Sequence, residues 1–218
     1  MEITWYGHSC FRITERGMAT VVTDPYDHNV VGYKELNLRA DIVTISHDAP
    51  GHNFINGVKG AKWHLDGPGE YEIGGVFITG IATHADNKRG ATRGLNNIFT
   101  FDFGGITVGH LGLIGHVPTQ SQVESLGTVN VLLVPVGGGG SLTPARASEV
   151  ISLFEPSIVV PMYYKIAGLE QKLGTLSGFL KEMGLEQTDA QETFRVNKSD
   201  LSEETQVVVL EPKRRDEG

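Results

Sequence analysis

The sequence contains one cysteine, Cys10, so no disulfide can form within the chain. Chains without disulfides suit a reducing compartment, and we expect a cytoplasmic protein. The sequence also lacks a run of about 20 apolar residues, the length that a membrane-spanning helix needs. Its first residues, MEITWYGHSCFRI, are neither basic nor continuously apolar, unlike a signal peptide. We therefore expect no association with a membrane.

Positive charge is scarce. The chain has 18 Lys and Arg against 26 Asp and Glu, a formal net charge of −8. Nucleic-acid binding requires clustered Lys and Arg to neutralise phosphates, so we expect no nucleic-acid partner. The 218 residues, 39% hydrophobic and 20% charged, are typical of one globular domain spanning 1–218. The charged end, 211–218, is expected to fray.

Glycine and proline divide the chain into short segments, with 28 and 9 residues respectively. The segments between them are rich in β-branched and aromatic residues, which favour strands. The early segments alternate in polarity, and the later ones are almost wholly apolar, as in strands buried on both faces. The predicted strands are 3–6, 10–14, 20–23, 42–46, 75–79, 97–103, 106–110, 131–134, 158–161 and 205–210.

Helix signals lie mainly in the second half of the chain. Segments 119–126 and 143–154 each open with a threonine suited to an N-cap, and Pro144 suits the first turn. Segment 174–183 ends at a glycine. The order is β-hairpins followed by β–α–β–α–β units. It favours an α/β protein with two packed sheets and outer helices over a doubly wound sheet.

Polar residues follow five of the predicted strands. A lone buried histidine usually has a structural role, but repetition of this pattern at strand ends predicts one shared cleft. The residues are Asp24, His47 and His52, His84 and Asp86, His110 and His116, and Tyr163 with Lys165.

Seven motifs then identify a resemblance. They read ITWYGHSCFRI (3–13), VVTDPYD (21–27), ADIVTISHD (40–48), GPGEYEIGGVFITGI (67–81), TVGHLGLIGH (107–116), VNVLLVPVGGG (129–139) and EPSIVVPMYYK (155–165). In order and spacing they resemble the metallo-β-lactamase superfamily, in the branch that opens with a WxGHSCFxI strand. The resemblance implies a four-layer αββα sandwich, an active site at one edge between the sheets, and metal-dependent hydrolysis.

The resemblance also implies a ligand set, and this chain departs from it. The family's H-x-H-x-D-H loop falls on ISHDAPGH, where His47 and His52 are retained. Alanine, glycine and leucine offer no side-chain lone pair, and tyrosine, with a pKa near 10, is a poor zinc ligand. The five substituted ligand positions are Ala49, Gly51, Ala85, Leu113 and Tyr163. His84 lies one place before the fourth family histidine, on the opposite face of a strand.

We therefore expect no metal cofactor. The first hypothesis is a metallo-β-lactamase-fold protein with a degenerate dinuclear site that is not a conventional hydrolase. It would bind a small anionic or apolar ligand, form homo-oligomers, or pair with an active homologue. The resemblance makes Asp24 the residue that orients a ligand histidine. His8 either supports this site or satisfies a backbone carbonyl.

Two enzymatic alternatives stay open. In the first, a single Zn, Mn or Fe ion on His47, His52 and His84 hydrolyses phosphoester, lactone or amide bonds. In the second, His47 or His52, oriented by Asp24, performs metal-free acid–base catalysis.

Overall fold

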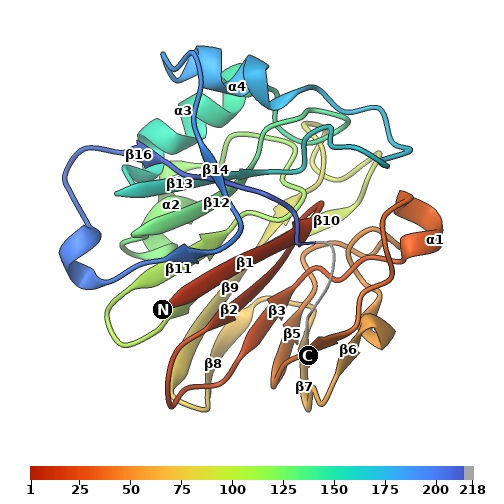
Figure 1. Ribbon diagram of the computed structural model, residues 1–218, viewed down its shortest axis with the longest axis vertical. Helices are drawn as coiled ribbons and strands as arrows, with labels where there is room; N and C mark the ends of the chain where they lie inside the picture. The colour runs from red at the N-terminus through yellow and green to blue at the C-terminus, as the bar shows by residue number, and fades with distance from the viewer. Residues whose placement is uncertain (214–218) are drawn as a thin grey trace.

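The computed structural model describes residues 1–213; the remainder of the segment predicted to fray, 214–218, lies outside the described residues. Two β-sheets pack face to face (Figure 1). The six-stranded sheet has the order β15-β1-β2-β3-β5-β7. It consists of β1 (Glu2–Gly7), β2 (Cys10–Thr14), β3 (Val21–Thr23), β5 (Ile42–Thr44), β7 (Trp63–Leu65) and β15 (Phe194–Arg195).

The seven-stranded sheet has the order β16-β13-β12-β11-β10-β9-β8. Its antiparallel part runs from β8 to β11, and its parallel part runs from β11 to β16. The strands are β8 (Gly69–Ile73), β9 (Val76–His84), β10 (Leu95–Asp102), β11 (Thr107–His110), β12 (Val131–Pro135), β13 (Ile158–Met162) and β16 (Gln206–Val207).

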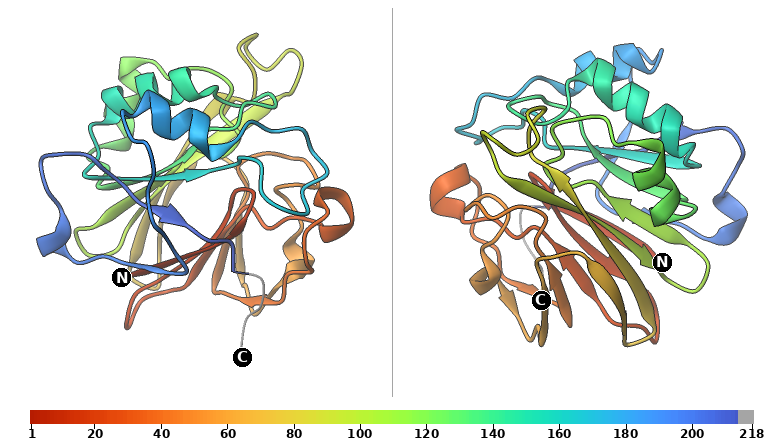
Figure 2. Two further views of the ribbon diagram at one scale, coloured as in Figure 1. Left: turned by 45° about the horizontal axis from the view of Figure 1, so that its top comes forward. Right: turned by 180° about the vertical axis from the view of Figure 1, so that it is seen from behind.

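Helices form the outer layer over the seven-stranded sheet (Figure 2). They are α2 (Gln120–Leu126), α3 (Pro144–Phe154) and α4 (Leu176–Glu182). A Thr119 capping box starts α2, and the Thr143 hydroxyl caps α3. Within 1–213, no helix combines the length and apolarity that crossing a membrane demands.

The outer layer over the six-stranded sheet is mostly irregular. It contains the one-turn helix α1 (His28–Val31), the 3-10 turn η1 (Ile55–Gly57) and the paired strands β4 (Leu38–Arg39) and β6 (Val58–Lys59). The remaining elements are η2 (Lys198–Asp200) and the paired strands β14 (Ala190–Gln191) and β17 (Val209–Leu210). Together the layers form the expected αββα sandwich.

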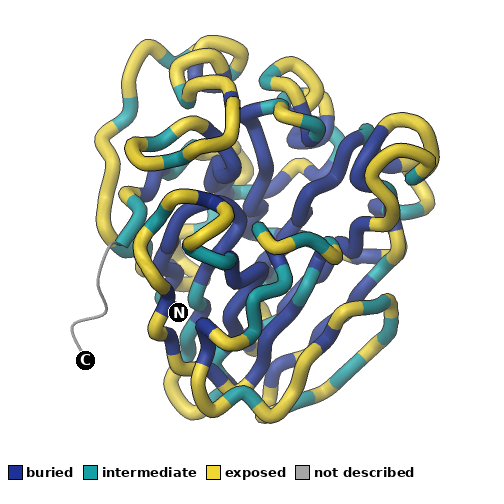
Figure 3. Tube along the Cα trace, turned by 90° about the vertical axis from the view of Figure 1, so that its right-hand side faces the viewer, coloured by how far each residue is buried: buried dark blue, intermediate teal, exposed yellow. Residues whose placement is uncertain are grey.

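Strand alternation explains the two cores. Val21 and Ile42 belong to the main core, whereas their neighbours Val22 and Val43 face the core under the irregular layer. Successive side chains of a strand point to opposite faces, so strands between two layers must be apolar on both. Figure 3 shows the resulting buried strands joined by exposed loops.

The structure corrects some predicted boundaries. The segment 205–210 is two strands, since β16 pairs with β13 while β17 pairs with β14. The third helix starts at Leu176, later than expected, because the backbone of Thr175 is extended and this residue is the N-cap. The edge strands β7 and β8 were not predicted; both are partly exposed and lack a continuous apolar run.

Candidate functional site

Loops that follow β1, β5, β9, β11 and β13 meet in a pocket of about 490 Å³. We name it the histidine pocket. It is lined by His8, Val30, Val31, His47, Ala49, Pro50, Gly51, His52, Arg93, Leu113, Tyr163, Glu170 and Gln171. The structure thus brings together both retained histidines and four of the five substituted positions.

Asp24 lies beneath this pocket, fully buried at the end of β3. Its carboxylate accepts hydrogen bonds from the backbone N–H and the hydroxyl of Ser46 and faces His52 Nδ1 at 2.8 Å. Burial alone would raise the pKa of Asp24, but the nearby His110 and the bonds from His52 and Ser46 outweigh it and lower this pKa. An ionised carboxylate only accepts, so His52 Nδ1 donates this hydrogen bond, and in the neutral form of the ring Nε2 is the nitrogen without a proton.

His47 is anchored in the same way through a different acceptor. Its Nδ1 lies 2.8 Å from the carbonyl oxygen of Leu95, which can only accept. Burial lowers the pKa of His47, partly opposed by that hydrogen bond, so the ring is neutral at neutral pH. The His47 and His52 ring centroids are 5.8 Å apart. The pocket therefore holds two imidazoles whose Nδ1 atoms are fixed.

His8 and Tyr163 occupy the space beside these rings. The centroid of the His8 ring lies 4.5 Å from that of Tyr163 and 5.1 Å from that of His52. The rings of Tyr163 and His52 are stacked, with centroids 5.9 Å apart. A Cβ added to Gly51 would lie 2.9 Å from His8 Nε2. The Tyr163 hydroxyl accepts a 2.7 Å hydrogen bond from Gln171. Burial lowers the pKa of His8 well below its usual value and raises that of Tyr163.

This donor set does not fit the dinuclear metal centre that the fold family implies. Ala49, Gly51 and Leu113 contribute no donor, and the hydroxyl of Tyr163 is engaged by Gln171. Residues 1–213 contain no group of three or more His, Cys, Asp or Glu side chains that could hold a metal ion. Even a catalytic zinc site keeps three protein ligands.

His84 does not join the two retained histidines. Its backbone N–H donates to His116 Nε2 at 3.3 Å, and the two rings are 5.6 Å apart. Ala85 is fully buried in the main core. Neither His84, Ala85 nor His116 lines the histidine pocket.

Asp86 organises the loop after β9. Its carboxylate accepts the backbone N–H groups of Lys88, Gly90, Thr92 and Arg93 at 2.7–2.8 Å. Burial would raise the pKa of Asp86, but these four donors together lower it. The carboxylate therefore fixes the backbone that carries Arg93 into the pocket wall.

His110 and Lys165 also lie outside the pocket lining. His110 is fully buried, its Nε2 lies 3.0 Å from the Ser9 carbonyl, and burial lowers its pKa. Lys165 is exposed after β13. His110 is thus held in the core by the Ser9 carbonyl, while Lys165 is exposed to solvent.

Arg93 lies between two cavities. A second cavity of about 800 Å³, lined among others by Asn53, Leu95 and Asn97, shares His47 and Arg93 with the histidine pocket. A Cβ on Gly140, whose φ is +109°, would coincide with the Arg93 guanidinium. The glycine-rich loop therefore accommodates this cation against its backbone.

The sequence did not indicate that Arg93 would lie at the pocket wall. Sequence reasoning also missed Gln171 and Glu170, which lie in a loop with no motif. Ser46, which precedes His47, was the one missed residue whose position gave a signal.

Comparisons with known proteins agree with this architecture. The sequence model of the beta-lactamase superfamily domain matches residues 2–163. A crystal structure from Thermotoga maritima, a candidate Zn-dependent hydrolase of the metallo-β-lactamase superfamily, is 36% identical. That match covers 96% of this chain and 97% of the other, with a TM-score of 0.77.

Two further relatives are more distant in sequence. The UPF0173 metal-dependent hydrolase of Thermoplasma acidophilum is 26% identical over 190 residues, which are 75% of this chain and 83% of that protein. Igni18, a metallo hydrolase from Ignicoccus hospitalis, is 20% identical with a TM-score of 0.67. The match covers 90% of this chain and 99% of the Igni18 chain.

Proposed function

The chain belongs to the metallo-β-lactamase superfamily, and from this premise we propose that it binds a small anionic ligand in the histidine pocket without a dinuclear metal centre. Its relatives include metal-dependent hydrolases. The proposal sets this chain apart from them as a ligand-binding member.

One observation carries the proposal: two of the positions that should hold metal ligands, Gly51 and Tyr163, are packed against neighbouring side chains. An added Cβ at Gly51 would lie 2.9 Å from His8 Nε2, so an aspartate there would require the His8 ring to move. Tyr163 stacks on His52 and is tied to Gln171. Coordinating groups left without a metal would be buried and unpaired, so their joint replacement by packed side chains suits a protein that functions without one.

Charge favours an anionic ligand. Arg93 is exposed at the pocket wall and forms no ion pair with a carboxylate in the described part of the chain. A guanidinium binds carboxylates and phosphates through two parallel hydrogen bonds. Glu170 is an acidic lining residue, and it is exposed. The buried Asp24 is hydrogen-bonded to His52.

The Asp24–His52 pair favours a second candidate, metal-free acid–base catalysis on the bound anion. The carboxylate fixes the tautomer of His52, which leaves Nε2 as a proton acceptor. Tyr163 covers one face of this ring, so the ligand would have to reach the ring edge.

Elemental analysis of protein purified without a histidine tag tests the first proposal. We expect well under one equivalent of zinc, manganese or iron, and phosphate binding that a chelator does not change. About one equivalent of metal, with hydrolysis abolished by a chelator and by His47→Ala, would overturn it. Hydrolysis that survives the chelator but is lost in His52→Ala would support the second candidate.

A further inference from the structure

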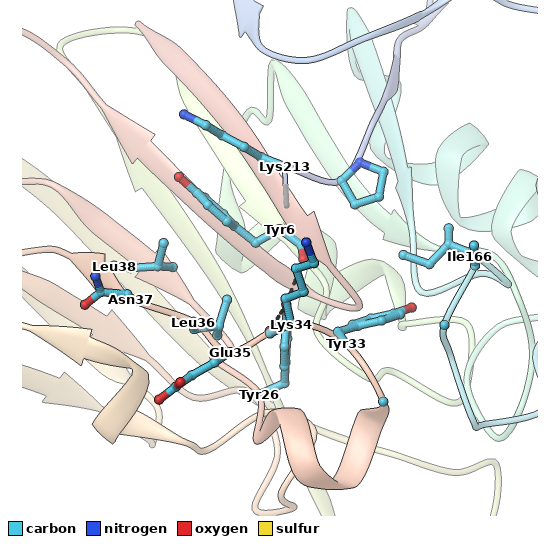
Figure 4. Close-up of a pocket in the computed structure, with 14 residues that line it drawn as sticks. Tyr6, Tyr26, Tyr33, Lys34, Glu35, Leu36, Asn37, Leu38, Ile166 and Lys213 are labelled. Carbon is cyan, nitrogen blue, oxygen red and sulfur yellow. Dashed lines mark hydrogen bonds between the residues drawn. The ribbon is translucent and has the colours of Figure 1, made fainter. Parts of the chain in front are cut away.

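A third cavity, of about 260 Å³, lies beside β1, between segment 32–38 and the segments 166–168 and 212–213 (Figure 4). We propose that this tyrosine cavity binds a small planar aromatic carboxylate. The inference does not depend on the function of the histidine pocket, because the two share no lining residue.

The walls of the tyrosine cavity are aromatic and fixed in place. The hydroxyl of Tyr26 donates to the Tyr6 carbonyl at 3.0 Å, and the rings of Tyr26 and Tyr33 meet edge to face at 5.4 Å. Aromatic pairs of this geometry hold their rings in defined orientations. A bound aromatic ring would meet preformed edges and faces instead of having to order them.

The lining also contains apolar residues that are held in place. Leu36 and Leu38 are buried, and Ile166 is half-buried. A Cβ on Gly32 would collide with the Gly168 carbonyl oxygen, so the two loops that form the walls touch through their backbones. The cavity is slightly smaller than the roughly 300 Å³ lower bound of common ligand pockets, which limits the occupant to a small ring system.

Charge at the rim selects an anion. Lys34 and Lys213 line the cavity, and Glu35 is the acidic residue among its lining. Figure 4 shows the Lys34 amine directed toward Tyr6, while the Glu35 carboxylate points to the opposite side. Lys34 is exposed, so its ammonium can meet a carboxylate at the mouth while the ring of the ligand enters the apolar part.

Tyr33 separates this cavity from the histidine pocket. Its ring lies 6.4 Å from that of His8 in an edge-to-face arrangement. Each cavity can therefore be altered by variants that leave the other lining unchanged. Arg93 belongs to the histidine pocket and not to the tyrosine cavity, and the reverse holds for Lys34.

Titration calorimetry of the full chain with 2-naphthoate tests the inference, with 2-naphthamide and cyclohexanecarboxylate as neutral and non-aromatic comparisons. We expect naphthoate to bind more tightly than either. Lys34→Gln should weaken naphthoate binding about tenfold, the value of one charge-assisted hydrogen bond. Lys59→Gln, an exposed lysine on β6 outside the cavity, should leave it unchanged.

A second variant guards against indirect effects of the lysine change. Ile166→Trp should fill the cavity and abolish naphthoate binding while leaving phosphate binding at the histidine pocket intact. No measurable naphthoate binding, or equal loss in Arg93→Gln and Lys34→Gln, would overturn the assignment.

Discussion

His52 and Asp24 form a buried hydrogen-bonded pair in which Nδ1 and Oδ2 are 2.8 Å apart. Both residues follow strands of the six-stranded sheet, and the pair joins the loop after β3 to the loop after β5. Ser46 adds two further donors to the same carboxylate. This arrangement ties the floor of the histidine pocket to the core.

Asp24→Asn should therefore destabilise the protein. The amide loses the charge that all three donors address and leaves one of them facing an N–H group. We expect a loss of about 2–4 kcal/mol in the free energy of unfolding, measured by urea denaturation. Asp189→Asn, at an exposed residue just before β14, should change it by less than about 0.5 kcal/mol. Equal effects would show that the pair has no special role in stability.

Stability should also fall as the pH is lowered from 7.5 to 5. Burial lowers the pKa of His8 and of His110, so the unfolded chain binds protons below about pH 6.5 that the folded chain refuses. As the pH falls through this range, each of the two histidines lowers the free energy of unfolding by up to about 1.4 kcal/mol per pH unit. The Asp24 carboxylate, whose folded pKa is also lowered, acts in the same direction but only below about pH 4.

His8→Asn tests that window. Asparagine tolerates the φ of +54° found at residue 8, so the backbone should be kept while one titrating group is lost. The slope of unfolding free energy against pH between 7 and 5 should decrease. His64→Gln, at an exposed residue of β7, serves as the control and should preserve the slope. An unchanged slope in His8→Asn would contradict the assignment.

The elements that sequence alone predicted are those with strong local signals. Thr143 and Pro144 define the start of α3, and alternation defines β1 and β2. The split between β16 and β17 was not predictable, because it depends on which distant strand each half pairs with. The edge strands β7 and β8 are held by one neighbour each and keep polar, exposed residues.

In the candidate site, too, the residues within motifs were predictable and the contacts between loops were not. The motifs identified His47, His52 and Asp24; the two histidines line one pocket, and Asp24 is hydrogen-bonded to His52 beneath it. The contact of His8 with Gly51 and the bond from Gln171 to Tyr163 join loops that no single motif contains. No local pattern encodes such contacts, since they depend on how the loops pack.

Those contacts predict the outcome of rebuilding the metal site. The five changes are Ala49→His, Gly51→Asp, Ala85→His, Leu113→Asp and Tyr163→His. The aspartate introduced in place of Gly51 would meet His8 Nε2, so we expect the rebuilt protein to bind less than one equivalent of zinc. Adding His8→Ala should raise the zinc content measured by elemental analysis. If the first variant already binds two equivalents, His8 does not obstruct the site.

Gly140→Ala tests the role of Arg93 without touching the arginine. The new methyl group would occupy the position of the guanidinium, so Arg93 should be displaced from the pocket wall. We expect phosphate binding to weaken about tenfold, as in Arg93→Gln, when measured by calorimetry. Gly127→Ala is the matched control: its φ of +68° also disfavours a side chain, but nothing lies within 4 Å of the added Cβ. It should cost about 1 kcal/mol of stability and leave phosphate binding unchanged. Normal phosphate binding in Gly140→Ala would show that Arg93 does not hold the anion.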